Sequence, residues 1–251
     1  MANSMSVLEI DRITKNFGAV RAADDLSLHL APGECHAIIG PNGAGKTSLI
    51  AQVSGVLTPD SGRISFFGRN ITTWPIWRRS QAGIARSFQV ASIFPEFMVI
   101  ENVALSIQAH KSHSFYFFRR SREEEQLRAA AELIISQVGL GAKANVLAVN
   151  LSHGEQRQLE LAMTLASSPS LLLLDEPMAG MGSIDSQRMI NLLQELKGTV
   201  TILLVEHDMD AVFALADRIT VMVYGKIIAS GAPEDIKNNA DVRIAYLGQT
   251  V

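Results

Sequence analysis

Two patterns of apolar residues run along the chain, and together they predict a mixed α/β fold. The segment "DLSLHL" places Leu26, Leu28 and Leu30 at every second position, which is typical of a strand with one buried face. The segments "SLLLLDE" at 170–176 and "TVTILLVEH" at 199–207 are almost continuously apolar, as expected of parallel strands buried on both faces. We therefore expect a core with a mostly parallel sheet and an antiparallel part near the N-terminus.

Helical spacing dominates elsewhere. Between the two apolar runs, one predicted helical face consists of Met189, Leu192, Leu193 and Leu196. The segment of about 90–165 lacks comparable strand signals, and its clearest apolar stripe, which stops at Gly139, contains Leu127, Ala131, Ile134 or Ile135, and Val138. We predict one domain over residues 1–251, with a helical subdomain inserted at about 90–165. Near the end, alternating runs on both sides of Gly225–Lys226 predict a hairpin at the sheet edge.

Composition narrows the classes of function. A chain of 251 residues with 47% hydrophobic composition can bury a large core, and its net charge of −3 offers no positive field for nucleic acid. The single cysteine, Cys35, excludes an intrachain disulfide and a thiolate metal cluster, and fits a reducing compartment. The start lacks a basic signal-peptide region, and the apolar runs are far shorter than the roughly 18 residues of a membrane span. We expect any membrane connection to be made through a partner.

A phosphate-binding motif follows the first apolar strand. The segment "GPNGAGKT", Gly40–Thr47, fits G-x-x-x-x-G-K-[ST], with the strand "CHAIIG" before it and the helical segment "SLIAQVSGVL" after it. Lys46 would reach the β- and γ-phosphates of a nucleotide, and the Thr47 hydroxyl would coordinate Mg²⁺. The backbone N–H groups expected to surround the β-phosphate belong to Asn42, Gly43, Ala44, Gly45, Lys46, Thr47 and Ser48. The alternative is a glycine-rich turn that arises by chance.

Two later strands end in groups that complete such a site. Asp175 ends the run "LLLLDE", where a carboxylate can hold Mg²⁺ through water, and Glu176 can polarise an attacking water as a general base. The segment "VEHD" repeats the arrangement one strand later and places His207 at the same edge of the sheet. The alternatives are a solvated loop start for the two carboxylates and a structural role for the histidine.

The segment "LSHGE" begins a further helix. Ser152 and Glu155 have the spacing of a capping box, in which each side chain accepts a hydrogen bond from a backbone N–H group at the helix start. A capping box does not explain Gly154, because glycine in a first helical turn costs up to about 1 kcal/mol relative to alanine. A backbone that another group must approach closely is a better explanation. We expect an anion at this helix N-terminus.

In this order, the motifs resemble those of the nucleotide-binding subunit of ABC transporters, from about Val7 to Gly248. Phe17 in "KNFG" matches the aromatic residue that stacks on adenine. Gln89 in "RSFQ" matches the glutamine that opens the helical subdomain and contacts both Mg²⁺ and the transmembrane partner. The resemblance implies a P-loop NTPase fold that binds ATP and Mg²⁺, with Lys46, Glu176 and His207 as catalytic residues.

The segment "LSHGE" is similar to the LSGGQ signature of that family, with His153 and Glu155 as departures. The resemblance implies that Ser152, Gly154 and Glu155 face the γ-phosphate of ATP held by a second subunit. Capping and phosphate binding are compatible, because both use the same helix end. Another departure is Gly182, which stands where the family usually has the D-loop aspartate.

The resemblance also implies partners and a location. These are transmembrane permease subunits, a second ATP-binding subunit that is either a copy or a paralogue, and indirectly a substrate-binding protein, with the chain peripheral on the cytoplasmic face of the membrane. The length, "EPMAGM" and "VRIAYLG" resemble the branched-chain amino-acid uptake subfamily of importers. Other cargoes (urea, an amide or a lipid), a soluble ABC ATPase of translation or DNA repair, and a small-molecule kinase are the alternatives.

The aromatic and basic segment "HKSHSFYFFRRSREEE" at 110–125 is not explained by these motifs. It is typical either of a nucleic-acid or lipid contact or of a loop and helix start within the helical subdomain. We favour the loop and helix start, because the chain has no net positive charge.

Overall fold

The computed structural model describes residues 6–87, 93–110 and 121–247, and only the backbone at 121–123 and 245–247. The chain divides into two compact units. Unit 1 comprises Met1–Ile84, Ser170–Glu176 and Leu193–Val251, and unit 2 comprises Ala85–Pro169 and Pro177–Leu192. Each unit is described by itself.

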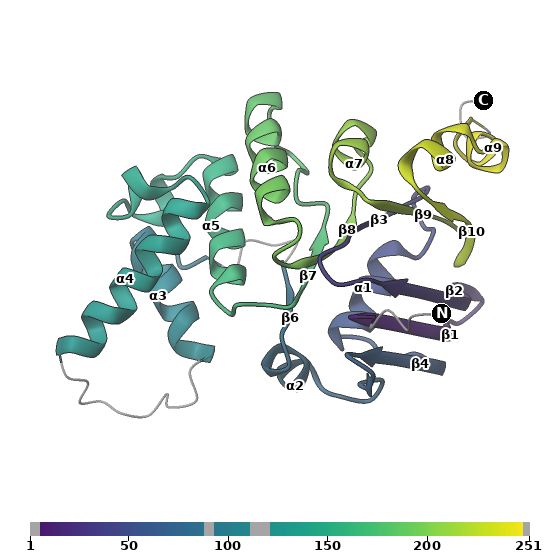
Figure 1. The fold of residues 1–251 in the computed structure, drawn as a ribbon, viewed down its shortest axis with the longest axis horizontal. Coiled ribbons are helices and arrows are strands. Elements are labelled where there is room, and N and C mark those ends of the chain that lie inside the picture. Colours follow the sequence, from purple (N-terminus) through teal and green to yellow (C-terminus); the bar gives the residue numbers. More distant parts are fainter. Residues whose placement is uncertain (1–5, 88–92, 111–120, 248–251) are drawn as a thin grey trace. The chain divides into compact units, whose positions relative to one another are not determined.

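Figure 1 labels most of the strands and helices of the chain. The strands are β1 (Leu8–Phe17), β2 (Val20–Leu30), β3 (Cys35–Ile39), β4 (Ser61–Phe66), β5 (Arg69–Asn70), β6 (Ile84–Arg86), β7 (Leu171–Asp175), β8 (Thr201–Val205), β9 (Arg218–Val223) and β10 (Lys226–Gly231). The α-helices are α1 (Lys46–Ser54), α2 (Ile76–Gln81), α3 (Val99–His110), α4 (Ser121–Gln137), α5 (His153–Leu165), α6 (Ser183–Leu196), α7 (Met209–Leu215), α8 (Pro233–Asn238) and α9 (Ala240–Leu247). The 3-10 helices are η1 (Gly141–Lys143) and η2 (Ala148–Asn150).

The predicted antiparallel part is a four-stranded sheet in the order β2-β1-β4-β5. Leu8 pairs with Leu30 and Ile10 with Leu28 across the β1–β2 ladder. The leucines of β2 are buried, while Ser27 between them is exposed. The alternating pattern therefore defines the buried face of this sheet, as predicted.

The larger sheet has the strand order β10-β9-β3-β8-β7-β6. Strand β3 is parallel to β8 and β9, and β7 is parallel to β8. Ile38 packs in one hydrophobic cluster, while its neighbours Ala37 and Ile39 pack in another. Because successive side chains of a strand point to opposite faces, both faces of β3 are covered, which explains its continuous apolar run. The predicted hairpin is confirmed, since β9 and the edge strand β10 are antiparallel.

Helices make up most of unit 2. Helices α3, α4 and α5 contact one another. Helix α4 ends at Gln137, and Gly139 follows it with a φ of +78°. The buried apolar residues of these three helices include Val99, Ile100, Val103, Ile107, Ala131, Ile135, Leu159, Leu161 and Ala162. No helix in the described ranges is long and apolar enough to cross a membrane. Of the segment 110–125, residues 111–120 lie outside the described part.

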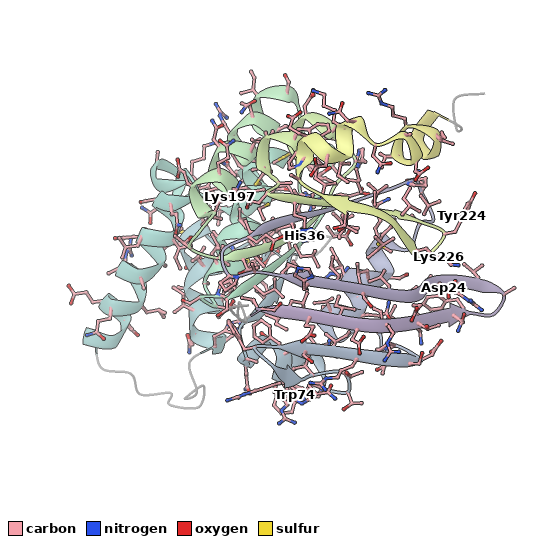
Figure 2. All side chains as sticks on the ribbon, turned by 45° about the vertical axis from the view of Figure 1, so that its right-hand side comes forward. Asp24, His36, Trp74, Lys197, Tyr224 and Lys226 are labelled. Atoms are coloured by element: carbon pink, nitrogen blue, oxygen red, sulfur yellow. The ribbon has the colours of Figure 1, made fainter. Side chains whose placement is uncertain are left out.

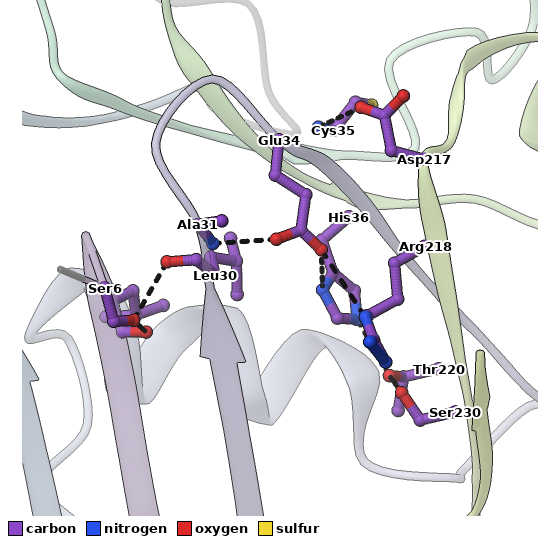
Figure 3. A network of polar contacts seen from close by, with 11 residues as sticks. Ser6, Leu30, Ala31, Glu34, Cys35, His36, Asp217, Arg218, Thr220 and Ser230 are labelled. Atoms are coloured by element: carbon purple, nitrogen blue, oxygen red, sulfur yellow. Dashed lines mark hydrogen bonds and ion pairs between the residues drawn. The ribbon is translucent and has the colours of Figure 1, made fainter. Parts of the chain in front are cut away.

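A buried polar network surrounds the first residues of β3 (Figure 3). The fully buried His36 places Nδ1 3.0 Å from Glu34 Oε1 and Nε2 2.8 Å from Thr220 Oγ1, and Thr220 in turn bonds Ser230 at 2.8 Å. An ionised carboxylate only accepts hydrogen bonds, so His36 donates from Nδ1 and accepts the Thr220 hydroxyl at Nε2. This network joins β3, β9 and β10 at the end of the sheet away from the P-loop.

Candidate functional site

The loop between β3 and α1 has the backbone geometry of an anion site. Helix α1 begins at Lys46, its N-cap is Gly45 with a φ of 101°, and no side chain of the described residues caps it. A Cβ atom on Gly45 would lie 2.0 Å from the carbonyl oxygen of Ala22 on β2, so only glycine fits this close approach. The first N–H groups of α1 have no partner within the helix, and they point to the space before it.

The side chain of Lys46 lies within this loop. Its ammonium donates hydrogen bonds to the carbonyl oxygens of Gly40 at 2.7 Å and Pro41 at 3.1 Å. Burial lowers the pKa of Lys46, while the nearby carboxylates of Glu176 and Asp175 act in the opposite direction. The positively charged Lys46 ammonium therefore lies in the loop, near the first N–H groups of α1.

The carboxylates lie at the ends of neighbouring strands. Asp175 is the last residue of β7 and is buried, and its register partner on β8 is Val205. The N–H group of Glu176 donates to the carbonyl of Val205 at 2.9 Å, and Glu176 has a φ of +51°. Residues other than glycine occupy this left-handed region at a cost of about 1–3 kcal/mol, and such strained residues are concentrated at functional sites. Its carboxylate points to His207, with Oε1 3.8 Å from Nδ1.

Our sequence analysis missed Glu206. Its carboxylate is 1% exposed and its Oε2 accepts hydrogen bonds from the N–H groups of His207 at 3.0 Å and Asp208 at 3.4 Å. Its Oε2 also lies 3.8 Å from His207 Nδ1. His207 is therefore flanked by two carboxylates, one from each strand end. The signal in the sequence was that Glu206 is a charged residue directly after the apolar run of β8.

The β9–β10 hairpin also supports the loop, which the sequence did not indicate. The N–H group of Gly225 donates to the carbonyl of Ala44 at 2.9 Å, and the N–H group of Asp24 on β2 donates to the carbonyl of Gly225 at 2.9 Å. Lys226 lies 3.3 Å from the Asp24 carboxylate, and Tyr224 points outward beside them (Figure 2). The turn thus connects the P-loop to the antiparallel sheet.

Phe17 is the expected adenine contact. Phe17 ends β1 with 48% of its surface exposed, and Lys15 Nζ lies 5.7 Å from its ring centroid. Its open face suits a stacking partner. Gln89 falls outside the described residues.

The signature segment forms the start of α5 in unit 2. The predicted capping box is confirmed: the Glu155 N–H donates to Ser152 Oγ at 3.3 Å, and the Ser152 N–H donates to Glu155 Oε2 at 2.9 Å. An ion pair with Lys143 and the bond from the Ser152 N–H hold the pKa of Glu155 below its usual value. The group that approaches Gly154 closely is the side chain of Asp185.

Comparison with known proteins supports one family. The sequence pattern of the ABC transporter family matches residues 23–179, and that of the branched-chain amino acid ATP-binding cassette transporter matches residues 226–251. The high-affinity branched-chain amino acid transport ATP-binding protein LivG of Escherichia coli is 36% identical, over 98% of this chain and 99% of its own length. BraF of Pseudomonas aeruginosa, which has the same description, is 35% identical over the same shares of the two chains.

A solved structure agrees with the sequence relatives. The crystal structure of an ABC transporter's ATP-binding cassette in its ADP conformation superposes with a TM-score of 0.85 and 33% identity, over 97% of this chain and 99% of that one. The family pattern spans more than half of the sequence, and the relatives match it almost end to end. This chain therefore belongs to the ATP-binding, ATP-hydrolysing subunits of the ABC transporter family.

Proposed function

We propose that this chain hydrolyses ATP to drive uptake of branched-chain or related amino acids through separate transmembrane subunits. The observation that supports the catalytic part is that the parallel strands β3, β7 and β8 end at one edge of the sheet, where Lys46 at the start of α1, Glu176 and His207 follow them. In this proposal Lys46 is the cation that binds phosphate, Glu176 is the general base, and His207 is a polar group that contacts the γ-phosphate. The relatives' names support the cargo.

Hydrolysis in this proposal is an in-line attack of water on the γ-phosphorus. Glu176 polarises the water and takes its proton, while Lys46 and His207 stabilise the charge that spreads over the γ-phosphate oxygens as the bond to the β-phosphate breaks. The left-handed backbone at Glu176 and the 3.8 Å separation from His207 support these roles. Catalysis is then mainly a matter of position and charge.

The loop and strand ends also fit Mg²⁺. Thr47 is exposed in the first turn of α1, and the buried Asp175 ends the adjacent β7, so a hydroxyl and a carboxylate are available as hard oxygen ligands. We propose Gln89 as a further ligand and Phe17 as the adenine platform. Bound Mg²⁺ would neutralise charge on the β- and γ-phosphates.

We propose that the signature acts on a second subunit, either a copy of this chain or a paralogue. Ser152 and His153 are exposed at the N-terminus of α5, and the Ser152 hydroxyl, which accepts a hydrogen bond in the capping box, keeps its own proton to donate to a ligand. Ser152, Gly154 and Glu155 would then contact the γ-phosphate of ATP held by the other P-loop. The dipole of α5 favours a negative charge at this end.

We propose that the chain is one ATPase domain, with its helical subdomain at about 90–165, and lies on the cytoplasmic face of the membrane against its transmembrane subunits. An exposed apolar patch in unit 2 supports this partner: Phe94 and Phe97 stack with ring centroids 5.4 Å apart, beside Met98, which pairs with Leu147. The Asn102 side chain fixes the patch by accepting from the Phe94 N–H at 2.7 Å. Contiguous exposed apolar residues commonly mark protein contacts.

Transport in reconstituted vesicles tests the whole proposal. The chain is assembled with its transmembrane subunits and a substrate-binding protein, and ATP-dependent accumulation of leucine is compared with that of urea. We expect leucine accumulation that disappears with Lys46→Ala. ATP hydrolysis with urea accumulation alone would overturn the cargo, and ATP hydrolysis by a chain that never joins the membrane fraction would overturn the transport function.

A further inference from the structure

Arg79 is a buried cation at the far end of the P-loop helix. Its side chain belongs to α2 in unit 1 and is 1% exposed. Burial lowers its pKa to about 10, so the guanidinium is still charged at neutral pH. Among the described residues no carboxylate pairs with it. A buried charge without a counter-ion needs another source of stabilisation.

Four backbone carbonyl groups supply that stabilisation. Nη1 donates to the carbonyl oxygens of Gln52 at 2.7 Å and Val53 at 2.8 Å, which belong to the last turn of α1. Nη2 donates to Thr72 at 2.9 Å, and Nε donates to Trp74 at 3.0 Å. The guanidinium therefore joins the C-terminal end of α1 to the segment at 72–74, of which Trp74 is labelled in Figure 2.

The chemistry at this helix end specifically suits arginine. The last carbonyl groups of a helix lack partners within it and carry the negative end of the helix dipole, so a cation is favoured there. The planar guanidinium of Arg79 donates from three nitrogen atoms in fixed directions to four carbonyl groups, whereas a lysine ammonium has three donors on a single nitrogen and cannot make all four contacts. Gly55, which follows α1, leaves room for it, since a Cβ atom there would lie 2.9 Å from Arg79 Nε and 3.1 Å from Cδ.

The opposite end of the same helix is the phosphate site. Helix α1 contains nine residues, so its ends are about 14 Å apart at about 1.5 Å per residue. A helix is rigid over this length, and a tilt of about 4° around the anchored end would move its N-terminus by about 1 Å. Misplacement of about 1 Å can reduce an enzymatic rate about a hundredfold.

We propose that Arg79 is a positioning residue of the ATPase site: by binding the C-terminal carbonyl groups of α1, it sets the position of the P-loop at the other end of the helix. Arg79 touches neither the loop nor a nucleotide. The inference rests on the proposed function in one respect, that the P-loop holds the phosphates of ATP.

The test compares ATP affinity and turnover in the full-length chain carrying Arg79→Lys or Arg79→Met. The matched control is Arg78→Met, because Arg78 is the exposed neighbour whose guanidinium lies 4.0 Å from the Trp74 ring. We expect both Arg79 variants to raise the KM and the dissociation constant for ATP by about tenfold or more, with Arg79→Met the worse. The control should stay within about twofold of the wild type. A folded Arg79→Met chain with wild-type KM and kcat would overturn the proposal, because a purely structural role changes the folded fraction and not the KM.

A second pair of variants covers failure of the Arg79 variants to fold. Gly55→Ala keeps the arginine but pushes on its guanidinium, and Gly68→Ala carries a similar left-handed strain, at a φ of +72°, with no atom within 4 Å of the added Cβ. We expect a raised KM for ATP in Gly55→Ala relative to Gly68→Ala, and equal values would reject the positioning role. Lys46→Ala serves as the separate check. If that variant binds ATP like the wild type, the proposed nucleotide site fails, whatever Arg79 does.

Discussion

The carboxylate of Asp185 occupies the space that a Cβ atom on Gly154 would fill. That atom would lie 2.6 Å from Asp185 Cγ, 2.7 Å from Oδ2 and 2.8 Å from Cβ. Arg188 holds the other carboxylate oxygen, Oδ1, at 3.2 Å. Within unit 2, the group that comes this close to Gly154 is a carboxylate of the same chain, while contact with the γ-phosphate of a second subunit stays a prediction. A carboxylate at the first turn of α5 is favoured by the helix dipole.

We therefore predict that Gly154→Ala destabilises the chain through contact with Asp185, although alanine is the better helix former by about 1 kcal/mol. Asp185→Ala removes the carboxylate but leaves Cβ, and Asp185→Gly removes both. The loss in the free energy of unfolding caused by Gly154→Ala should be largest with Asp185 present, smaller with Asp185→Ala and smallest with Asp185→Gly. Denaturant titration of the single and double variants measures it. An equal loss in all three backgrounds would show that Asp185 is not the reason for this glycine.

The position of Glu176 predicts a variant that binds ATP without hydrolysing it. Glu176→Gln keeps the shape and the left-handed backbone but cannot take a proton, so phosphate release should fall by about a hundredfold or more while ATP affinity stays near wild type. Steady-state phosphate release and nucleotide binding measure the two effects. Phosphate release at the wild-type rate would exclude this residue as the base.

Glu206 should act through His207. Glu206→Ala removes the acceptor of two backbone N–H groups, which costs about 1–3 kcal/mol of stability. The backbone of His207 then loses a contact that fixes its position. We expect ATP turnover to fall by about ten- to a hundredfold. The double variant with His207→Ala should be no slower than His207→Ala alone, because both changes remove the same contribution.

Asp208→Asn is the matched control for this experiment. Asp208 caps α7 by accepting from the N–H groups of Asp210 and Ala211, and it does not hold His207. Its turnover should stay near wild type. Independent, additive losses from Glu206→Ala and His207→Ala would argue against the connection.

The buried His36 predicts that stability decreases in mild acid. Burial lowers the pKa of His36 below its ordinary value of 6.5, and this outweighs the opposite effect of Glu34. The unfolded chain therefore binds the proton first, so stability is complete above about pH 6.5 and is lost as the pH falls below it. Melting temperatures measured between pH 8 and 5 should show this decrease.

The variant His36→Gln should lose much of that pH dependence, whereas His29→Gln, at an exposed position of β2, should keep it. Glu34 titrates in a separate window. Burial would raise its pKa, but the contacts with His36 and the Ala31 N–H together lower it, so its contribution is lost only below about pH 4.5. An unchanged pH dependence in His36→Gln would assign the effect to other groups.

Most of the fold and the outline of the site could be predicted from the sequence, because the signals are local. The alternation in β2, the continuous apolar runs of β7 and β8, and the capping box of Ser152 and Glu155 each lie within a few consecutive residues. A strand's period and a cap's spacing are set by backbone geometry alone. The P-loop is of the same kind, since a strand, a glycine turn and a helix follow directly in the chain.

Only the tertiary structure decided which distant residues meet. Asp185 reaches Gly154, Arg79 reaches the end of α1, Gly225 bonds Ala44, and Glu206 is buried against the backbone of His207. In the sequence each of these residues is an ordinary charged or small residue that suits solvent equally well. Their roles depend on the packing that removes water around them. Once buried, an arginine, a carboxylate or a backbone carbonyl must find a partner, and the fold determines which partner is near.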